Sequence, residues 1–171
     1  LRASWKEEVR SELRIIFGGL AFEPILAELE AIHKNILRKR VFVALHINPV
    51  CGEHSRTVHK QIYFSGNELT NAKITPAKNL YKNTLFFVDE SSMISNESEY
   101  EGPNVLMDLM NYVFQGVNCQ LIFIGDLGQL PPVGQEESIA LNAEAFQVMF
   151  PTVRVFASQL SEVVRVQEHS A

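Results

Sequence analysis

Two acidic residues, Asp89 and Glu90, directly follow the apolar run Leu85–Val88. A fully apolar run of this length predicts a buried parallel strand, and open parallel sheets bind ligands at the carboxyl ends of their strands. An aspartate there can hold a hydrated Mg²⁺ that bridges nucleotide phosphates. A neighbouring glutamate can orient and polarise the water that attacks the terminal phosphate. The alternative is a capped strand end with two solvated carboxylates.

A second apolar run, Leu121–Ile124, ends in Gly125 and Asp126, and Gln129 and a proline pair follow it. Gly125 would let two backbones approach closely at the strand end. The pair Pro131–Pro132 fixes two φ angles, so we expect a loop that transmits a small movement rather than absorbing it. Gln129 could hydrogen-bond a phosphate oxygen or a water without adding charge. The alternative is a generic proline-rich turn.

The surrounding sequence predicts the elements that would position these groups. Apolar runs followed by loops and helical patterns predict parallel strands at Val41–Leu45, Thr84–Val88 and Gln120–Ile124, with a fourth candidate at Thr152–Phe156. Helical spacing predicts helices at Thr57–Phe64, Asn104–Gln115 and Ile139–Phe150. The polar stretch Ser65–Asn83 is expected to be a linker outside the core. One α/β domain, with a parallel sheet and flanking helices over residues 41–171, accounts for these elements.

Residues 1–40 predict a divergent helical segment. A capping-box pattern, Ser4 with Glu7, opens a first amphipathic helix, and a second apolar stripe begins at Pro24. Near the end of this second stripe lies the basic cluster Lys34–Arg40, where cations suit the helix dipole. The cluster is interpreted as a solvated helix end, with a DNA-binding patch as the alternative.

Composition limits the function classes. The chain has 171 residues, 46% of them hydrophobic and 20% charged, which is typical of a globular protein with a real core. Its formal net charge of −5 argues against holding nucleic acid by bulk electrostatics, although residues 1–60 are mildly basic and the rest strongly acidic. Two cysteines, no membrane-length apolar run and no leader pattern predict a cytoplasmic protein without a membrane partner.

Two motifs carry a family resemblance. The string Asn83–Ser95 resembles the Walker B motif of RecD-like and Dda-like superfamily 1 DNA helicases, and Gly125–Gln135 resembles their motif III. The resemblance implies the first motor domain of such a helicase, with an incomplete three-layer, RecA-like parallel sheet of the P-loop NTPase class. It further implies ATP as substrate, Mg²⁺ coordinated by Asp89, Glu90 as catalytic base and Gln129 as sensor of the γ-phosphate. Asp126 is placed on the nucleotide side as well.

Two further segments extend this resemblance. Leu160–Arg165 resembles motif IV, whose arginine neutralises charge on the transferred phosphoryl group, and this role falls on Arg165. Thr57–Tyr63 resembles a segment along the path of single-stranded DNA. By that likeness Thr57 and His59 contact the sugar-phosphate backbone and Lys60 adds a charge-assisted contact. The alternatives are a solvated arginine, a helix-capping Thr57 and an ordinary surface His59.

The sequence departs from the family at an important place. No Gly-x-x-x-x-Gly-Lys-Ser/Thr string is present, and Phe17–Pro24, at the corresponding distance upstream, keeps a glycine pair without a lysine. The stretch Leu45–Arg56 is shortened and lacks the family's Thr-Gly-Arg-Ala-Ala pattern. A helicase also needs a second motor domain or partner chain, so this chain is not expected to unwind DNA alone.

Two functional hypotheses follow. The first is an ATP-dependent DNA helicase motor domain, with 5′-to-3′ travel implied only by the family. The second is a non-hydrolysing remnant that binds DNA or a protein partner through the same scaffold. A structural Zn²⁺ is a separate alternative, because His46, Cys51, His54 and His59 lie at ligand-like spacings.

Overall fold

The computed structural model describes residues 41–46, 56–64, 75–97 and 103–159. The chain divides into two compact units, Lys39–Val155 and a second unit made of Leu1–Arg38 with Phe156–Ala171. All the elements below belong to the unit Lys39–Val155. The helices predicted before residue 40 lie outside the described residues, and the predicted domain boundary stays a prediction.

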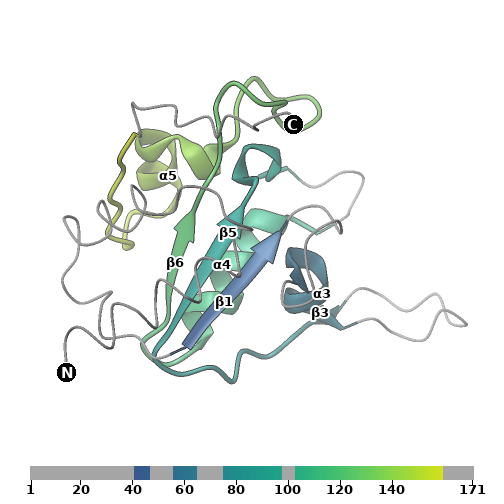
Figure 1. The fold of residues 1–171 in the computed structure, drawn as a ribbon, viewed down its shortest axis with the longest axis vertical. Helices are drawn as coiled ribbons and strands as arrows, with labels where there is room; N and C mark the ends of the chain where they lie inside the picture. Colours follow the sequence, from purple (N-terminus) through teal and green to yellow (C-terminus); the bar gives the residue numbers. More distant parts are fainter. Residues whose placement is uncertain (1–40, 47–55, 65–74, 98–102, 160–171) are drawn as a thin grey trace, which may run out of the picture. The chain divides into compact units, whose positions relative to one another are not determined.

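A four-stranded parallel sheet forms the centre of this unit, in the order β2-β1-β5-β6 (Figure 1). The strands are β1 (Val41–His46), β2 (Arg56–Thr57), β5 (Thr84–Asp89) and β6 (Gln120–Phe123). The register pairs His46 with Thr57 on one side and with Asp89 on the other, so three strands end at one edge. The three strands predicted from apolar runs and their parallel arrangement are confirmed.

Burial on both faces explains why β5 is a continuous apolar run. Phe86 and Val88 belong to a buried cluster with α4 (Val105–Gln115). Because successive strand residues point to opposite faces, Leu85 and Phe87 face the other way, and they are only 0% and 1% exposed. A strand covered on both faces does not alternate between apolar and polar residues. The end of this strand is therefore held firmly in place.

Helix α4 crosses behind the sheet and connects β5 to β6 (Figure 1). It begins at the cap Asn104, whose Oδ1 accepts from the Met107 amide at 2.9 Å. It ends at Gly116, where a Cβ would lie 2.6 Å from Cys119 Sγ and 2.7 Å from Asn79 Nδ2. A glycine is therefore required at this close approach, and the prediction of this helix is confirmed to within a residue.

The helix predicted at Thr57–Phe64 is confirmed over Val58–Ile62 and wrong at its last two residues, Tyr63 and Phe64. Helix α3 covers only Val58–Ile62, and Tyr63 turns to extended backbone at φ −123° and ψ 148°. The strand β3 (Tyr63–Phe64) then pairs antiparallel with β4 (Thr75–Pro76). Aromatic residues favour strands, and this pairing outweighs the helical spacing.

The predicted linker Ser65–Asn83 is wrong at Asn79, although most of its described residues, 75–83, are exposed. Asn79 is buried, and its Nδ2 donates to the Tyr112 carbonyl at 2.9 Å and the Val113 carbonyl at 3.3 Å. Its Oδ1 accepts from the Tyr81 amide at 2.8 Å. A polar side chain thus enters the core because it satisfies carbonyls at the end of α4.

The last predicted elements need correction too. The helix predicted at Ile139–Phe150 is divided into a 3-10 turn, η3 (Ile139–Leu141), and α5 (Ala143–Met149). No strand forms over residues 152–156. Instead, Gln147 Nε2 donates to the carbonyls of Phe150, Pro151 and Val153, which holds the chain in an irregular turn. No helix among the described residues has the length and apolar character needed to cross a bilayer.

Candidate functional site

The two carboxylates predicted to do chemistry stand at a sharp turn after β5. Asp89 is the last residue of the strand, and its Oδ1 accepts from the Glu90 amide at 2.9 Å. Glu90 adopts the left-handed conformation, at φ 55° and ψ 35°, and precedes the 3-10 turn η2 (Ser91–Met93). This conformation costs a residue other than glycine, asparagine or aspartate about 1–2 kcal/mol. Strained backbone of this kind concentrates at functional sites.

Glu90 differs in this respect from the other positive-φ residues described. Apart from glycine, these are Asn83 and Asn118, and asparagine tolerates the left-handed region. The turn at Glu90 is instead held by its neighbours, since the Ser91 hydroxyl donates to the Val88 carbonyl at 2.7 Å. We name residues 89–95 the acidic segment.

The loop that carries Gln129 begins beside this segment. The Ile124 amide donates to the Val88 carbonyl at 2.8 Å, and the Ser91 amide donates to the Ile124 carbonyl at 2.9 Å. Farther on, Asp126 Oδ1 accepts from the Gly128 amide at 2.8 Å, and the Gln129 amide donates to the Asp126 carbonyl at 3.1 Å. We name residues 124–138 the glutamine loop. The turn from Asp126 to Gln129 brings these two exposed residues close together in space.

Gly125 allows the two segments to touch. A Cβ at this position would lie 2.8 Å from Leu141 Cδ1, 3.0 Å from the Ser92 amide nitrogen and 3.2 Å from that of Ser91. Backbone cannot give way as a flexible side chain can. The predicted close approach of backbones at Gly125 is therefore confirmed.

Side-chain hydrogen bonds then tie the glutamine loop to the acidic segment. Ser92 Oγ donates to Gln129 Oε1 at 3.4 Å, and Gln135 Nε2 donates to Ser95 Oγ at 3.3 Å. Ser138 Oγ, which is buried, donates to the Ile94 carbonyl at 2.7 Å. The sequence did not predict these three contacts, although Ser92 and Ser95 directly follow the two carboxylates. A contact with a loop some 40 residues away leaves no local pattern in the sequence.

The predicted site residues on β5 and β6 are thus brought to one edge of the sheet. Asp89 and Glu90 end β5, and Asp126 and Gln129 follow β6, the strand paired with it. Arg165 lies outside the described residues, as do Cys51 and His54 of the possible Zn²⁺ set. Among the residues that are described, no group of three or more potential metal ligands is found.

A family model described as an AAA domain matches residues 32–135, which is more than half of the chain and includes the acidic segment and residues 124–135 of the glutamine loop. The chain belongs to this AAA domain family. Members of this family have a P-loop α/β fold, which agrees with the fold class predicted from the sequence. The family match indicates a nucleotide-binding, helicase-like motor. Neither a curated protein nor a solved structure matches the chain.

The residues predicted to contact DNA lie on another part of this AAA domain. Thr57 caps α3, its Oγ1 accepting from the Lys60 amide at 3.3 Å, which confirms the alternative interpretation of Thr57 as a helix cap. His59 and Lys60 are exposed, and the His59 ring lies 5.8 Å from that of Tyr63. Contact with DNA stays a prediction.

Two tyrosine hydroxyl groups connect α3 and the adjoining strand β3 to α4. Tyr63 Oη donates to Asp108 Oδ2 at 2.6 Å, and burial together with this hydrogen bond raises the pKa of Tyr63. Gln61 Nε2 donates to Tyr112 Oη at 2.6 Å in the core, and burial raises the pKa of Tyr112. These two hydrogen bonds hold α3 and its exposed residues His59 and Lys60 against α4.

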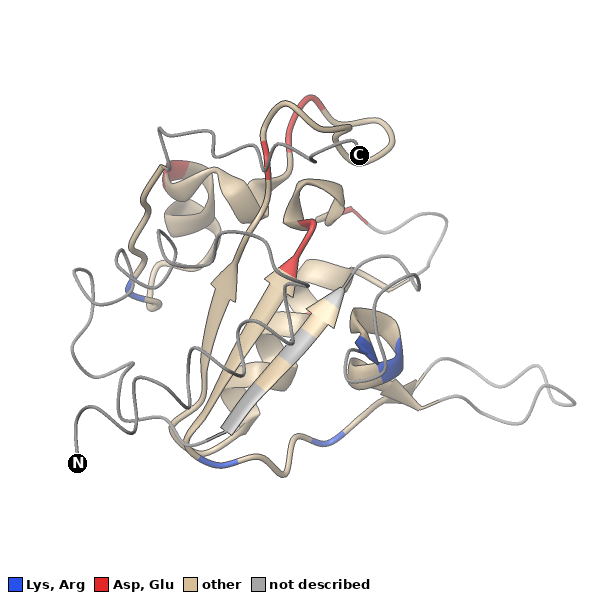
Figure 2. Cartoon of the chain, viewed as in Figure 1, with Lys and Arg blue, Asp and Glu red and all other residues tan. Residues whose placement is uncertain are grey.

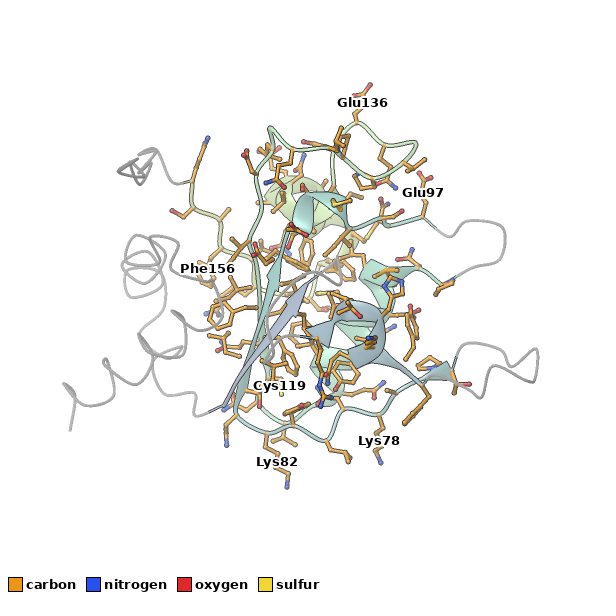
Figure 3. The ribbon with its side chains drawn as sticks, turned by 45° about the vertical axis from the view of Figure 1, so that its right-hand side comes forward. Lys78, Lys82, Glu97, Cys119, Glu136 and Phe156 are labelled. Atoms are coloured by element: carbon orange, nitrogen blue, oxygen red, sulfur yellow. The ribbon has the colours of Figure 1, made fainter. Side chains whose placement is uncertain are left out.

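Charge is distributed unevenly over this AAA domain. Acidic residues gather over the carboxyl ends of the strands, while Lys78 and Lys82 project at the opposite end (Figures 2 and 3). The sequence has no Lys or Arg between Lys82 and Arg154. A bound triphosphate would therefore meet carboxylates here, and its charge must be neutralised by a metal ion and by cations from other segments. This stretch without basic residues was a readable signal that sequence reasoning missed.

Proposed function

We propose that the chain forms part of the first motor domain of a RecD-like superfamily 1 DNA helicase, which couples Mg-ATP hydrolysis to 5′-to-3′ movement along single-stranded DNA. The observation that carries this proposal is the meeting of Asp89, Glu90 and Gln129 on two hydrogen-bonded segments at the carboxyl ends of β5 and β6. Parallel sheets bind ligands at this edge, and the AAA domain family supplies the nucleotide-binding context.

Asp89 suits a Mg²⁺ that is shared with a nucleotide. Magnesium sites in such proteins use one or two carboxylates, and phosphates and waters complete the coordination. Asp89 offers a half-buried carboxyl group whose Oδ1 is held by the Glu90 amide. Bound Mg²⁺ would neutralise charge on the β- and γ-phosphates.

Glu90 and Gln129 have complementary tasks in this proposal. Glu90 accepts a proton from the attacking water, and its left-handed backbone turns it out of the strand direction. Gln129 donates from its amide to a γ-phosphate oxygen without adding charge. Arg165 neutralises charge in the transition state, and Thr57, His59 and Lys60 contact the DNA backbone.

The test compares two neighbouring carboxylates. Binding of a fluorescent ATP analogue is measured with and without Mg²⁺, and phosphate release is measured with and without single-stranded DNA. Glu90→Gln should lower kcat by at least about 100-fold with nucleotide binding retained, because a general base acts mainly in the transition state. Asp89→Ala should instead weaken the Mg²⁺-dependent part of binding. Glu136→Gln, on the exposed part of the glutamine loop, is the matched control and should change neither property. Identical behaviour of the Asp89 and Glu90 variants would contradict the assignment.

A non-hydrolysing remnant that binds single-stranded DNA or a protein is the second candidate. The absence of basic residues between Lys82 and Arg154 favours it, because these carboxylates alone repel a triphosphate. It predicts no Mg-ATP binding. If the remnant binds DNA, Lys60→Ala should weaken a salt-dependent interaction, whereas Lys78→Ala, at the other end of the sheet, should not.

A further inference from the structure

We infer that Ser92 is a positioning residue, whose hydroxyl holds Gln129 Oε1 and thereby leaves Gln129 Nε2 as the donor toward the nucleotide. The inference rests on the proposed function for the identity of the ligand. It adds a role for a residue of the acidic segment to which no chemistry was assigned.

Burial makes Ser92 the fixed partner of this pair. Its side chain is 3% exposed, whereas Gln129 is exposed, and the two meet with Ser92 Oγ at 3.4 Å from Gln129 Oε1. An exposed glutamine without such a contact samples several rotamers, and ordering it costs free energy. A buried hydroxyl that accommodates one arrangement removes part of this cost before a ligand binds.

The backbone around Ser92 is itself immobilised. The Ser91 amide donates to the Ile124 carbonyl, and the Ser91 hydroxyl donates to the Val88 carbonyl. Gly125 packs directly against the amide nitrogen of Ser92. Ser92 is therefore held to the ends of both β5 and β6, and position is passed from Ser92 to Gln129 rather than in reverse.

The hydrogen bond from Ser92 to Gln129 matters because Ser92 lies close to Glu90 in the chain. Glu90 lies two residues before Ser92, and the turn η2 joins them. A hydrogen bond from Ser92 thus sets Gln129 relative to the same rigid turn that carries Glu90. The proposed base and the proposed γ-phosphate sensor then share one support, which fixes their separation.

A second serine–glutamine pair provides a matched control. Gln135 Nε2 donates to Ser95 Oγ at 3.3 Å, so Ser95→Ala removes one hydrogen bond between the two segments, together with two bonds to the Glu97 backbone, and leaves Gln129 untouched. A role limited to holding the segments together would make Ser95→Ala at least as damaging as Ser92→Ala. A positioning role makes Ser92→Ala the more damaging variant for ATP binding.

The experiment measures affinities for Mg-ATP and Mg-ADP in the full chain, for Ser92→Ala, Ser95→Ala, Gln129→Ala and the double variant of Ser92 and Gln129. Ser92→Ala should weaken ATP binding about fivefold, the usual effect of one neutral hydrogen bond, and leave ADP binding unchanged. It should have no further effect once Gln129 is alanine. Equal losses for ATP and ADP, or additive losses in the double variant, would overturn the inference.

A second readout does not depend on nucleotide. The side-chain amide resonances of Gln129 are followed by ¹⁵N NMR in the wild type and in both serine variants, with the backbone spectrum as the test of folding. Ser92→Ala should shift these resonances toward those of a freely rotating glutamine, and Ser95→Ala should not. Unchanged resonances in Ser92→Ala refute the positioning role. A wild type that binds neither nucleotide refutes the proposed function, and the resonances still decide the role of Ser92.

Discussion

Strands β5 and β6 have similar sequences but differ in how deeply their apolar residues are buried. Each is an apolar run that leads to an acidic residue, Leu85–Val88 before Asp89 and Leu121–Ile124 before Gly125 and Asp126. Yet the four apolar residues of β5 are at most 1% exposed, whereas those of β6 are all partly exposed. The difference follows from position, because β5 has a strand on each side and β6 pairs with β5 alone among the described strands.

The two strand ends differ in the same sense. Asp89 is half-buried and held by the Glu90 amide at a strained turn, whereas Asp126 is exposed and accepts from Gly128 within its own loop. The central strand therefore provides a rigid base for chemistry, and the outer strand carries a loop that contacts this base through Ser92, Ser95 and Ile94. The similar local sequences of β5 and β6 do not show which strand end is the rigid one.

The largest expected effect is a difference in the free energy of unfolding between substitutions of one phenylalanine in β5 and one in β6. Phe86→Ala removes a fully buried ring that packs edge-on against Tyr81 and Tyr112, and should lower the free energy of unfolding by about 3–5 kcal/mol. Phe123→Ala removes a partly exposed ring that packs on Phe146, and should cost about 1–2 kcal/mol. Urea denaturation measures both. If Phe86→Ala does not fold, Phe86→Leu and Phe123→Leu should show the same order, and equal costs would remove the distinction between the strands.

Much of the fold could be predicted because it depends on local pattern. Continuous apolar runs located β1, β5 and β6, and the cap and stripe of Asn104–Gln115 located α4. The order of strands in the sheet could not be predicted, since it is set by pairing between distant segments. The failures at Tyr63–Phe64 and Asn79 have the same cause, because a partner strand and the end of a helix decide those conformations.

The candidate site was predictable to a similar depth. Residue type and the position after apolar strands selected Asp89, Glu90, Asp126 and Gln129, and the structure brings them to one edge. The left-handed turn at Glu90 could not be predicted, because glutamate has no preference for that conformation. Ser92 was equally hidden, since its partner lies on another strand's loop. The resemblance to helicases suggested roles for the site residues, but only the structure shows the turn at Glu90 and the hydrogen bond from Ser92 to Gln129.

A smaller effect tests whether the outer loop is truly supported by the central strand end. Gly125→Ala should lower the free energy of unfolding by about 1–3 kcal/mol, because the added methyl group meets Leu141 and the amides of Ser91 and Ser92. Gly128→Ala is the control, since its methyl group would meet only the side-chain carboxylate of Asp126, 3.3 Å away, and it should cost less than about 0.5 kcal/mol. Thermal unfolding of both variants gives the comparison. Similar losses would show that the loop is not seated on the acidic segment.

The smallest expected effect concerns the strain stored at the end of β5. Glu90→Asn and Glu90→Gln both remove the charge, but only asparagine accepts the left-handed backbone readily. Glu90→Asn should therefore be more stable than Glu90→Gln by about 0.5–1 kcal/mol in urea denaturation. The matched pair Glu136→Asn and Glu136→Gln, in the exposed loop that follows β6, should show no gain for asparagine, because Glu136 has no positive φ to relieve. A Glu90→Asn variant no more stable than Glu90→Gln would mean that the turn is not strained. The contrast between a rigid strand end selected for chemistry and a relaxed one would then fail at its most specific point.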